Sequence, residues 1–252
     1  MNRVAVIGDV HGNIDALRAV LKDIKRESIN QLLIMGDLVG YYYHADKVLN
    51  ALKDWCYELI QGNHEAMLSE ISTWSDGTKE EYRRKYGSAL EQTAKILSKR
   101  EIAYLTKLPY QKELFIGGRF ILLCHGSPCN RDEYIYPDSS LEILKRCANN
   151  QYDVVIMGHT HYPMLKKINS TILLNPGSVG QPRNGQCGAS WAILDLDNLS
   201  VQFCMVNYNT KNLIKEINEK DPYVPYLTKI LRCRGGKQGC DYRNQILAKC
   251  NE

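Results

Sequence analysis

The stretch VAVIGDVHGN (residues 4–13) decides the fold. Its first four residues are apolar and predict a short buried strand that ends at Gly8. Apolar residues then recur at helical spacing, which predicts an amphipathic helix over residues 14–24. The segment therefore predicts a strand that leads through a polar turn into a helix, as in a parallel βαβ unit.

This pattern repeats twice further along the chain. Residues 32–35 form a second apolar run that leads into Gly-Asp, and residues 58–60 are predicted as a third strand that ends at Gly-Asn-His. A helical pattern over residues 45–54 lies between them. The order strand, helix, strand, helix, strand predicts a parallel sheet in a protein of the α/β class.

The second half of the chain predicts further helices and shorter strands. Strand patterns lie at residues 113–116, 119–124, 154–157, 164–168, 171–174, 190–196 and 201–206. The first two are joined by a Gly-Gly pair that suits a tight hairpin turn, and the last four favour antiparallel pairing. Helical patterns lie at residues 78–105, 138–148, 210–219 and 223–232. We expect one domain over residues 1–233 and a polar, loosely ordered tail over residues 234–252.

The composition limits the class of protein. A chain of 252 residues with 44% hydrophobic residues can form one domain with a substantial core. An evenly spread net charge of +4 does not favour a nucleic-acid binder. The nine cysteines include no Cys-x-x-Cys pair, so neither a zinc ribbon nor a redox motif is indicated. The sequence shows no signal peptide and no apolar run of about 20 residues, so we expect a reduced, cytoplasmic protein.

Eight polar side chains follow predicted strands, each at the point where its strand ends. They are Asp9, His11, Asp37, Asn63, His64, His125, His159 and His161. In parallel α/β sheets, ligands bind at the carboxyl ends of the strands. A single such residue is more often an ordinary turn or core residue, but eight together favour a metal site. Carboxylate, imidazole and amide ligands without a thiolate suit manganese, iron, zinc, nickel or cobalt, and argue against a structural zinc site.

Five segments of the chain resemble the signature blocks of the calcineurin-like metallophosphoesterases, in the family's order. They are residues 8–13, 36–37, 62–65, 125–126 and 158–161. The resemblance extends to about residue 207, and the segments 125–128 and 175–183 resemble the small, single-domain prokaryotic branch. It implies a four-layer αββα sandwich of two packed mixed β-sheets.

The resemblance also implies a role for each residue of the cluster. Asp9, His11 and His161 would bind one divalent metal, and Asn63, His125 and His159 would bind the other. Asp37 would bridge the two, since a shared anion offsets the repulsion between neighbouring cations. His64 would lie beside the metals and either donate a hydrogen bond to the phosphate or protonate the leaving oxygen.

The implied activity is hydrolysis of phosphomonoesters or phosphodiesters by a water that two metals activate, with manganese the first candidate. The expected partner is a small phosphorylated molecule, and nucleotides are among the options. Two other functions stay open. A non-catalytic interaction module of this fold is disfavoured because the chain keeps His64, and a nuclease is disfavoured because the chain lacks a basic stripe. The substrate, the oligomeric state and the choice between monoesters and diesters stay open as well.

Three further residues are weaker candidates for substrate binding. Arg183 either forks onto a phosphate or is a solvated surface residue. Asn13 either contacts phosphate or caps the helix that begins at residue 14, and the cap is favoured. Tyr41 leads three consecutive tyrosines, Tyr41–Tyr43, of which we expect at least one to be exposed beside the site and able to stack on a nucleobase. The alternative is that these rings cover the core near the helix over residues 45–54.

Overall fold

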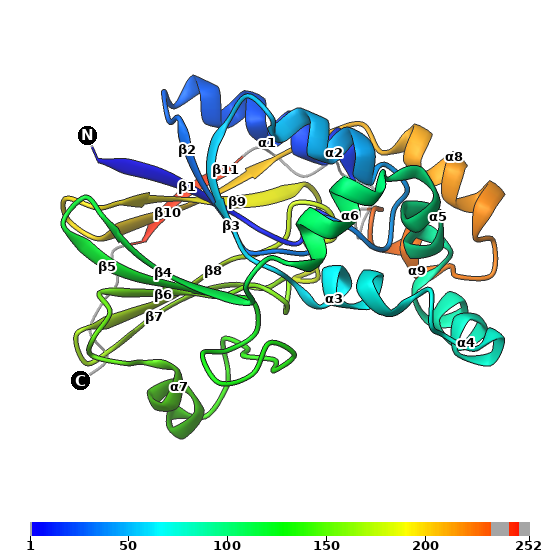
Figure 1. Ribbon diagram of the computed structural model, residues 1–252. Coiled ribbons are helices and arrows are strands. Elements are labelled where there is room, and N and C mark those ends of the chain that lie inside the picture. Colours follow the sequence, from blue (N-terminus) through cyan, green and yellow to red (C-terminus); the bar gives the residue numbers. More distant parts are fainter. Residues whose placement is uncertain (1, 233–241, 247–252) are drawn as a thin grey trace.

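Two β-sheets pack face to face in the computed structural model, which describes residues 2–232 and the backbone of residues 242–246 (Figure 1). The first sheet has the order β11-β10-β9-β1-β2-β3. Its strands are β1 (Arg3–Ile7), β2 (Gln31–Ile34), β3 (Cys56–Leu59), β9 (Ala189–Asp195), β10 (Ser200–Val206) and β11 (Tyr242–Ile246). The strands β1, β2 and β3 are parallel, as the repeated pattern predicts, and β9 pairs with the other side of β1 in antiparallel fashion.

The second sheet has the order β4-β5-β6-β8-β7. Its strands are β4 (Gln111–Ile116), β5 (Arg119–Cys124), β6 (Val154–Ile156), β7 (Pro163–Ile168) and β8 (Thr171–Pro176). The strands β5, β6 and β8 are parallel, and the edge strands β4 and β7 are antiparallel to their neighbours. Gly117 and Gly118 form the β4–β5 turn with φ angles of 59° and 77°, a conformation that glycine adopts without strain.

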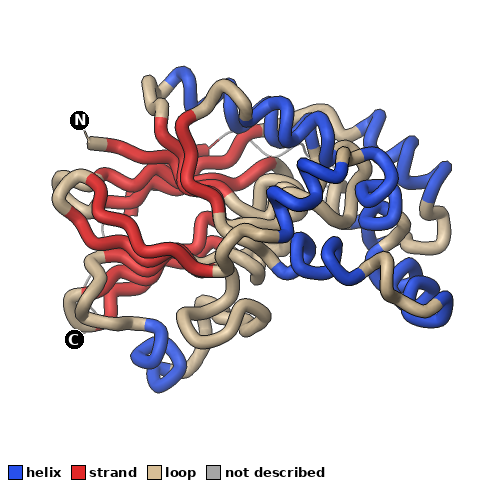
Figure 2. The backbone as a smooth tube through the Cα atoms, viewed as in Figure 1, coloured by secondary structure: helices blue, strands red, loops and turns tan. Residues whose placement is uncertain are grey.

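Helices cover the outer faces of both sheets, so the predicted four-layer αββα sandwich is confirmed (Figures 1 and 2). The helices are α1 (Ile14–Arg26), α2 (Ala45–Leu52), α3 (Asn63–Glu70), α4 (Asp76–Tyr86), α5 (Ala89–Ile96), α6 (Lys99–Thr106), α7 (Leu141–Cys147), α8 (Lys211–Lys220) and α9 (Tyr226–Lys229). Helices α1 and α2 pack on the first sheet and α7 packs on the second, while α3–α6, α8 and α9 gather at one end of the sandwich.

The residues of β1 show why the apolar runs are continuous. Val4 and Val6 face the second sheet, in a core that includes Leu123 and Ile156. Ala5 and Ile7 belong instead to the core beneath α1. Both faces of the strand are therefore buried, and a strand of this kind has no polar face to show in its sequence.

Three local features differ from the sequence-based prediction. The short helix α3 begins at Asn63, which the sequence pattern places only at a strand end. The helical stretch 78–105 is divided into three helices, because Gly87 ends α4 with a φ of 84° and Ser98 begins α6 with a capping box. The helical pattern at 223–232 gives only the four-residue helix α9.

The expected boundary at residue 233 falls in a stretch that lies outside the described residues, so the division into a domain and a tail stays a prediction. Of the expected tail, only residues 242–246 are described, and their backbone pairs with β10 as β11. Within the described part of the chain, no helix has the length and apolar character needed to cross a membrane.

Candidate metal centre

The loops that follow five strands bring all eight predicted site residues together. Asp9 and His11 follow β1, Asp37 follows β2, and Asn63 and His64 open α3 directly after β3. His125 follows β5, and His159 and His161 follow β6. All eight side chains are buried. The first sheet thus supplies five of them and the second sheet three, so the site lies where the two sheets meet.

The backbone at this site is strained. Asp9, His11, Asp37, His159 and His161 have φ angles between 51° and 65°, in the left-handed region that side chains other than glycine rarely occupy. Conformations of this kind persist only where surrounding structure enforces them, and they gather at functional sites. Hydrogen bonds between the loops provide that enforcement, since the backbone N–H of His11 donates to the carbonyl oxygen of Asp37 at 2.8 Å.

Three histidines are oriented by backbone carbonyl groups. Nδ1 lies 3.0 Å from the Val39 oxygen in His11, 2.6 Å from the Met35 oxygen in His125, and 2.6 Å from the Gln181 oxygen in His161. A carbonyl oxygen only accepts, so each Nδ1 must carry a hydrogen. In its neutral form, each of these rings presents the Nε2 lone pair to the centre of the site, as metal-binding histidines do.

The first cluster consists of Asp9, His11 and His161. Nε2 of His161 lies 3.4 Å from the Asp9 carboxylate and 3.1 Å from Nε2 of His11. Burial lowers the pKa of both histidines well below the ordinary value, so both rings are neutral and their lone pairs face each other. Oδ2 of Asp9 is buried and has no hydrogen-bond partner among the described residues. A cation between these atoms would separate the two facing lone pairs and would give Oδ2 of Asp9 a partner.

The second cluster consists of Asp37, His125 and His159, and Asn63 joins it. Oδ1 of Asn63 lies 3.1 Å from Nε2 of His125 and 3.0 Å from Nδ1 of His159. Oδ2 of Asp37 lies 3.4 Å from Nε2 of His125 and 3.7 Å from Nε2 of His11. Asp37 therefore lies next to residues of both clusters.

The ionisation of the buried acids reflects this arrangement. Burial raises the pKa of Asp9 to about 8. Burial also opposes the charged form of Asp37, but the surrounding histidines outweigh it and hold its pKa well below the ordinary value. Burial pulls the pKa of His125 down, yet the adjacent Asp37 carboxylate raises it on balance to about 10. The site thus keeps protons where a bound cation would take their place.

The donor set fits two divalent cations. Lone pairs of imidazole, carboxylate and amide groups converge in two clusters that share one carboxylate, and there is an orphaned carboxylate oxygen within the first. This combination of ligands suits borderline transition metals better than calcium or magnesium, which prefer oxygen alone. Asp9, His11 and His161 could hold one ion, Asn63, His125 and His159 the other, and Asp37 could contact both.

His64 lies next to the two clusters and contacts Asp37 and His11. Its backbone N–H donates to Oδ1 of Asp37 at 2.9 Å, and its ring centroid is 4.9 Å from that of His11. Nδ1 lies 3.1 Å from the hydroxyl of Tyr82. Gly40 leaves room for the ring, because a Cβ there would come within 2.3 Å of Nδ1. Atoms of His11, Asp37 and His64 also lie close enough together to hold an ion, so distances alone do not exclude His64 as a ligand.

Glu65 is a residue of this site that the sequence did not single out. Its carboxylate accepts the backbone N–H groups of Asp37, Leu38 and Gly62 at 2.7–2.8 Å and that of Val39 at 3.3 Å. These bonds join the loop that carries Asp37 to the start of α3. Glu65 therefore positions the loop that carries Asp37, and its place next to His64 in the chain gives no sign of this role.

The weaker candidates have definite places. Oδ1 of Asn13 accepts the N–H of Ala16 at 3.2 Å, so the favoured helix cap is confirmed, and its Nδ2 donates to Gly180 and Tyr208. Arg183 is not a solvated surface residue, because it donates to the Tyr41 hydroxyl at 2.8 Å and to the Gln181 side chain at 2.9 Å. Its guanidinium also stands over the Tyr41 ring, 5.7 Å from the centroid.

The expectation of an exposed tyrosine in Tyr41–Tyr43 is wrong. All three rings are buried, because α8, α9 and the segment between them cover them. The hydroxyl of Tyr43 donates to Asp221 at 2.6 Å, and the ring of Tyr41 meets His11 edge-on at 4.5 Å. Tyr134 is the exposed aromatic residue beside the site, with its ring centroid 4.1 Å from that of His159. Its loop has no strand or helix pattern that would place it there.

Comparison with known proteins agrees with this geometry. Residues 2–199 match the calcineurin-like phosphoesterase superfamily domain. The chain belongs to this superfamily. It is 30% identical over 233 residues to the uncharacterized protein MJ0912 of Methanocaldococcus jannaschii, covering 85% of this chain and 91% of that protein.

Two further proteins are similar to most of the chain. The phosphodiesterase YfcE of Escherichia coli K12 is 25% identical over 227 residues, which are 86% of this chain and 98% of YfcE. The crystal structure of hypothetical protein PH1004 from Pyrococcus horikoshii OT3 superposes with a TM-score of 0.80 at 26% identity, covering 95% of this chain and all of that one. The resemblance of the five sequence segments to the family is therefore confirmed.

Proposed function

We propose that this protein is a metal-dependent phosphoesterase that hydrolyses small phosphomonoesters or phosphodiesters. One observation carries the proposal. The neutral rings of His11 and His161 point their Nε2 lone pairs at each other across 3.1 Å, beside a carboxylate oxygen that has no described partner. The second ligand set lies next to this one, and Asp37 contacts both. Manganese is the first candidate for the two metals, and a phosphodiesterase relative supports the class of reaction.

Two divalent cations, once bound, supply the charge that activates water and neutralises phosphate oxygens. The protein supplies positions. Asp37 holds the two ligand sets at a common edge, and its own carboxylate is kept in place by the His64 backbone and by the loop that Glu65 organises. Because the proposed ligands are buried and backbone carbonyl groups orient His11, His125 and His161, little reorganisation would accompany the reaction, which is the main source of catalytic advantage in sites of this kind.

We assign His64 the role of a hydrogen-bond donor to the phosphate. Burial lowers its pKa, so the ring is neutral near pH 7. We assign the Tyr82 hydroxyl, 3.1 Å from Nδ1, as the donor of this hydrogen bond, which places the single ring proton on Nε2. Of the two roles that the family resemblance leaves open, a neutral Nε2–H favours phosphate binding over proton delivery to the leaving oxygen. Arg183, held by Tyr41 and Gln181, supplies a fixed positive charge near Asp9.

The test is a panel of substrates and metals. Protein stripped with a chelator is assayed with p-nitrophenyl phosphate, bis-p-nitrophenyl phosphate and methyl p-nitrophenyl phosphate, alone and with manganese, iron(II), zinc, nickel or cobalt. We expect no turnover without metal and turnover of at least one ester with manganese. Two equivalents of bound metal with no hydrolysis of any ester would instead indicate the non-catalytic interaction module, and this result would refute the proposed enzyme.

A further inference from the structure

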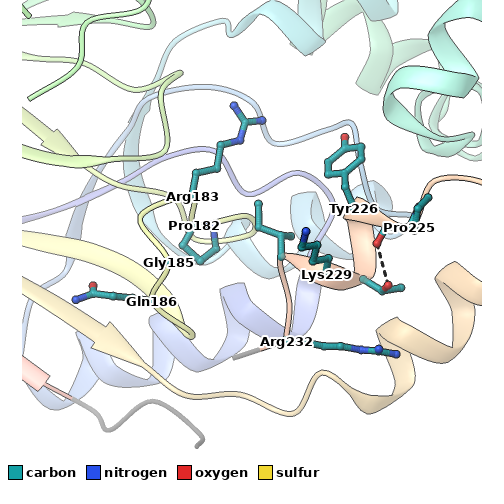
Figure 3. Close-up of a pocket in the computed structure, with 10 residues that line it drawn as sticks. Pro182, Arg183, Gly185, Gln186, Pro225, Tyr226, Lys229 and Arg232 are labelled. Carbon is teal, nitrogen blue, oxygen red and sulfur yellow. Dashed lines mark hydrogen bonds between the residues drawn. The ribbon is translucent and has the colours of Figure 1, made fainter. Parts of the chain in front are cut away.

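A cavity of about 660 Å³ lies beside the metal centre, between the loop that follows β8 and helix α9 (Figure 3). Pro182, Arg183 and Gln186 form one side of it, and Tyr226, Lys229 and Ile230 form the other. Its size is typical of sites for small organic molecules, which usually have volumes of 300–1,000 Å³. The proposed chemistry at the metals uses none of this space except through Arg183.

The charge around the cavity has one sign. Arg183, Lys229 and Arg232 line it, and no acidic residue is among its described lining residues. None of these three cations is ion-paired with an acid in the described part of the chain. Lys229 and Arg232 are exposed, whereas Arg183 is partly buried. Cations grouped without counter-charges raise the local concentration of anions.

Apart from Gly185 and the uncharged polar residues Gln186 and Thr228, the rest of the lining is apolar or aromatic. Pro182 and Pro225 stand on opposite sides, Ile230 adds an aliphatic surface, and Tyr226 contributes its ring. Figure 3 shows the side chains of Arg183 and Tyr226 extending to the same side of the cavity. Such a lining suits a ligand with a flat or apolar body as well as a negative charge, because the body gains contact area while the cations bind the anion.

The same two residues connect the cavity with the metal centre. Arg183 donates to the Tyr41 hydroxyl at 2.8 Å, and the Tyr226 ring centroid lies 6.2 Å from that of Tyr41. Tyr41 in turn contacts the metal-ligand candidate His11, with ring centroids 4.5 Å apart. Arg183 and Tyr226 thus belong both to the wall of the cavity and to the side chains that pack on Tyr41, so they are the residues that a substrate spanning the metals and the cavity would pass.

We propose that this cavity binds the part of the substrate that is not hydrolysed, and that this part carries a second anionic group on an apolar or aromatic body. A nucleotide with a phosphate beyond the reacting one has both features. The inference rests on the proposed phosphoesterase function and narrows its substrate class. Lys229 and Arg232 act as specificity residues, while the reaction itself stays with the metal ligands.

Three esters with an identical reacting group test the proposal. They are methyl p-nitrophenyl phosphate, thymidine 5′-(p-nitrophenyl phosphate), and the same thymidine ester with an additional 3′-phosphate. Only the retained arm changes, so the chemical step and the leaving group are held constant. We expect KM to fall from the first ester to the third. The decrease in KM that the 3′-phosphate causes should also become smaller as the salt concentration rises, because ions screen exposed charges.

The matched variants are Lys229→Ala with Arg232→Ala, and Lys145→Ala as a control on the exposed face of α7. We expect the double variant to raise KM for the 3′-phosphorylated ester roughly 5- to 30-fold, as for the loss of one or two partly exposed charged contacts. It should change KM for the methyl ester less than twofold. The control should behave as the unmodified protein with all three esters.

Two outcomes are separable. If all three esters are hydrolysed but the ratio of KM between the two thymidine esters is the same in the double variant and the unmodified protein, the cavity does not read the second anion. If neither these esters nor p-nitrophenyl phosphate is hydrolysed with any metal, the phosphoesterase function fails. Calorimetry with thymidine 3′,5′-bisphosphate then still tests whether the cavity binds an anion. A lower affinity in the double variant, with the affinity of Lys145→Ala unchanged, supports binding in the cavity. Equal affinity in all three proteins overturns it.

Discussion

The hydroxyl of Tyr82 lies 3.1 Å from Nδ1 of His64, and this contact determines which nitrogen of that ring can face a substrate. Tyr82 is on α4 and His64 on α3, so the orientation of the ring depends on how these two helices pack. The ring is buried and its pKa is lowered, which keeps it neutral near pH 7. Its role is therefore best tested by substrates that differ only in their leaving group.

We predict that His64→Ala keeps both metals and lowers kcat by roughly 10²- to 10⁴-fold, as for the loss of one well-placed catalytic group. The loss should be similar for good and poor leaving groups, because Nε2–H donates to the phosphate. Tyr82→Phe should give a smaller loss of the same kind. A loss that nearly disappears with a nitrophenolate leaving group would instead show that His64 delivers a proton to the leaving oxygen.

Removing the bridging carboxylate should break the metal pair. We expect Asp37→Asn to bind fewer than two equivalents of manganese after reconstitution and to lose turnover, because Asp37 contacts both ligand clusters. The sixth histidine offers the control. His44 lies outside the site and pairs with Glu216 at 2.9 Å, so His44→Ala should keep two equivalents. Elemental analysis of both variants measures this, and two tightly bound equivalents in Asp37→Asn would rule out the bridging role.

Metal affinity should rise with pH. In the metal-free protein, the pKa of His125 stands at about 10, since the Asp37 carboxylate outweighs the effect of burial. Burial raises the pKa of Asp9 to about 8. A metal binds the deprotonated forms, so it must displace these protons at lower pH, and affinity should increase by up to about tenfold per pH unit for each displaced proton. Calorimetry between pH 6 and 8 in buffers of different ionisation enthalpy counts the released protons. An affinity independent of pH would contradict this assignment.

Glu65 should be essential for the shape of the loop around Asp37. We predict that Glu65→Gln lowers the free energy of unfolding by roughly 2–4 kcal/mol, because an amide cannot accept all four backbone N–H groups and leaves buried donors unpaired. Glu70→Gln on the same helix is exposed and should be nearly neutral. Urea unfolding of the two variants gives the comparison. Equal stability would mean that the four bonds are replaced or contribute little.

Cys124 should be structural although it precedes His125. Burial raises the pKa of its thiol well above the ordinary value, so almost no thiolate exists near pH 7. Cys124→Ala should therefore keep normal turnover and lose roughly 1–2 kcal/mol of stability. In the native protein, a thiol reagent should modify the exposed Cys56 and Cys129 much faster than Cys124. Abolished catalysis in a variant that still folds and binds metal would overturn this prediction.

The sequence alone was sufficient for most of the site, because the residues that hold it are local to strand ends. Each apolar run reports a buried strand, and the polar residue that follows must lie at the edge of the sheet. The prediction did not include helix α3. Asn63 and His64 were interpreted as ligands at a strand end, although they are also the first two residues of this helix. The strained φ angles at Asp9 and Asp37 could not be predicted either, because the residue type at these positions does not indicate a left-handed conformation.

Long-range contacts explain what the sequence could not show. The burial of Tyr41–Tyr43 depends on α8 and α9, and the Tyr42 hydroxyl reaches the carbonyl oxygen of Leu227, 185 positions away. The carboxylate of Glu65 acts on N–H groups up to 28 positions before it. Neither partner can be read from periodicity, because tertiary packing brings these residues together.

The division of the ligands between two sheets has a consequence for how the protein is made. A ribosome synthesises the chain from its N-terminus, so the ligands of the first sheet emerge well before His161, the last of the set. The strand β9, which flanks β1, follows later still, at residues 189–195. If this set holds the two metals, as proposed, a nascent chain lacks the complete pair of sites during most of its synthesis. Completion of the sites belongs to the final stage, since a chain that stops before residue 161 lacks one of the proposed ligands.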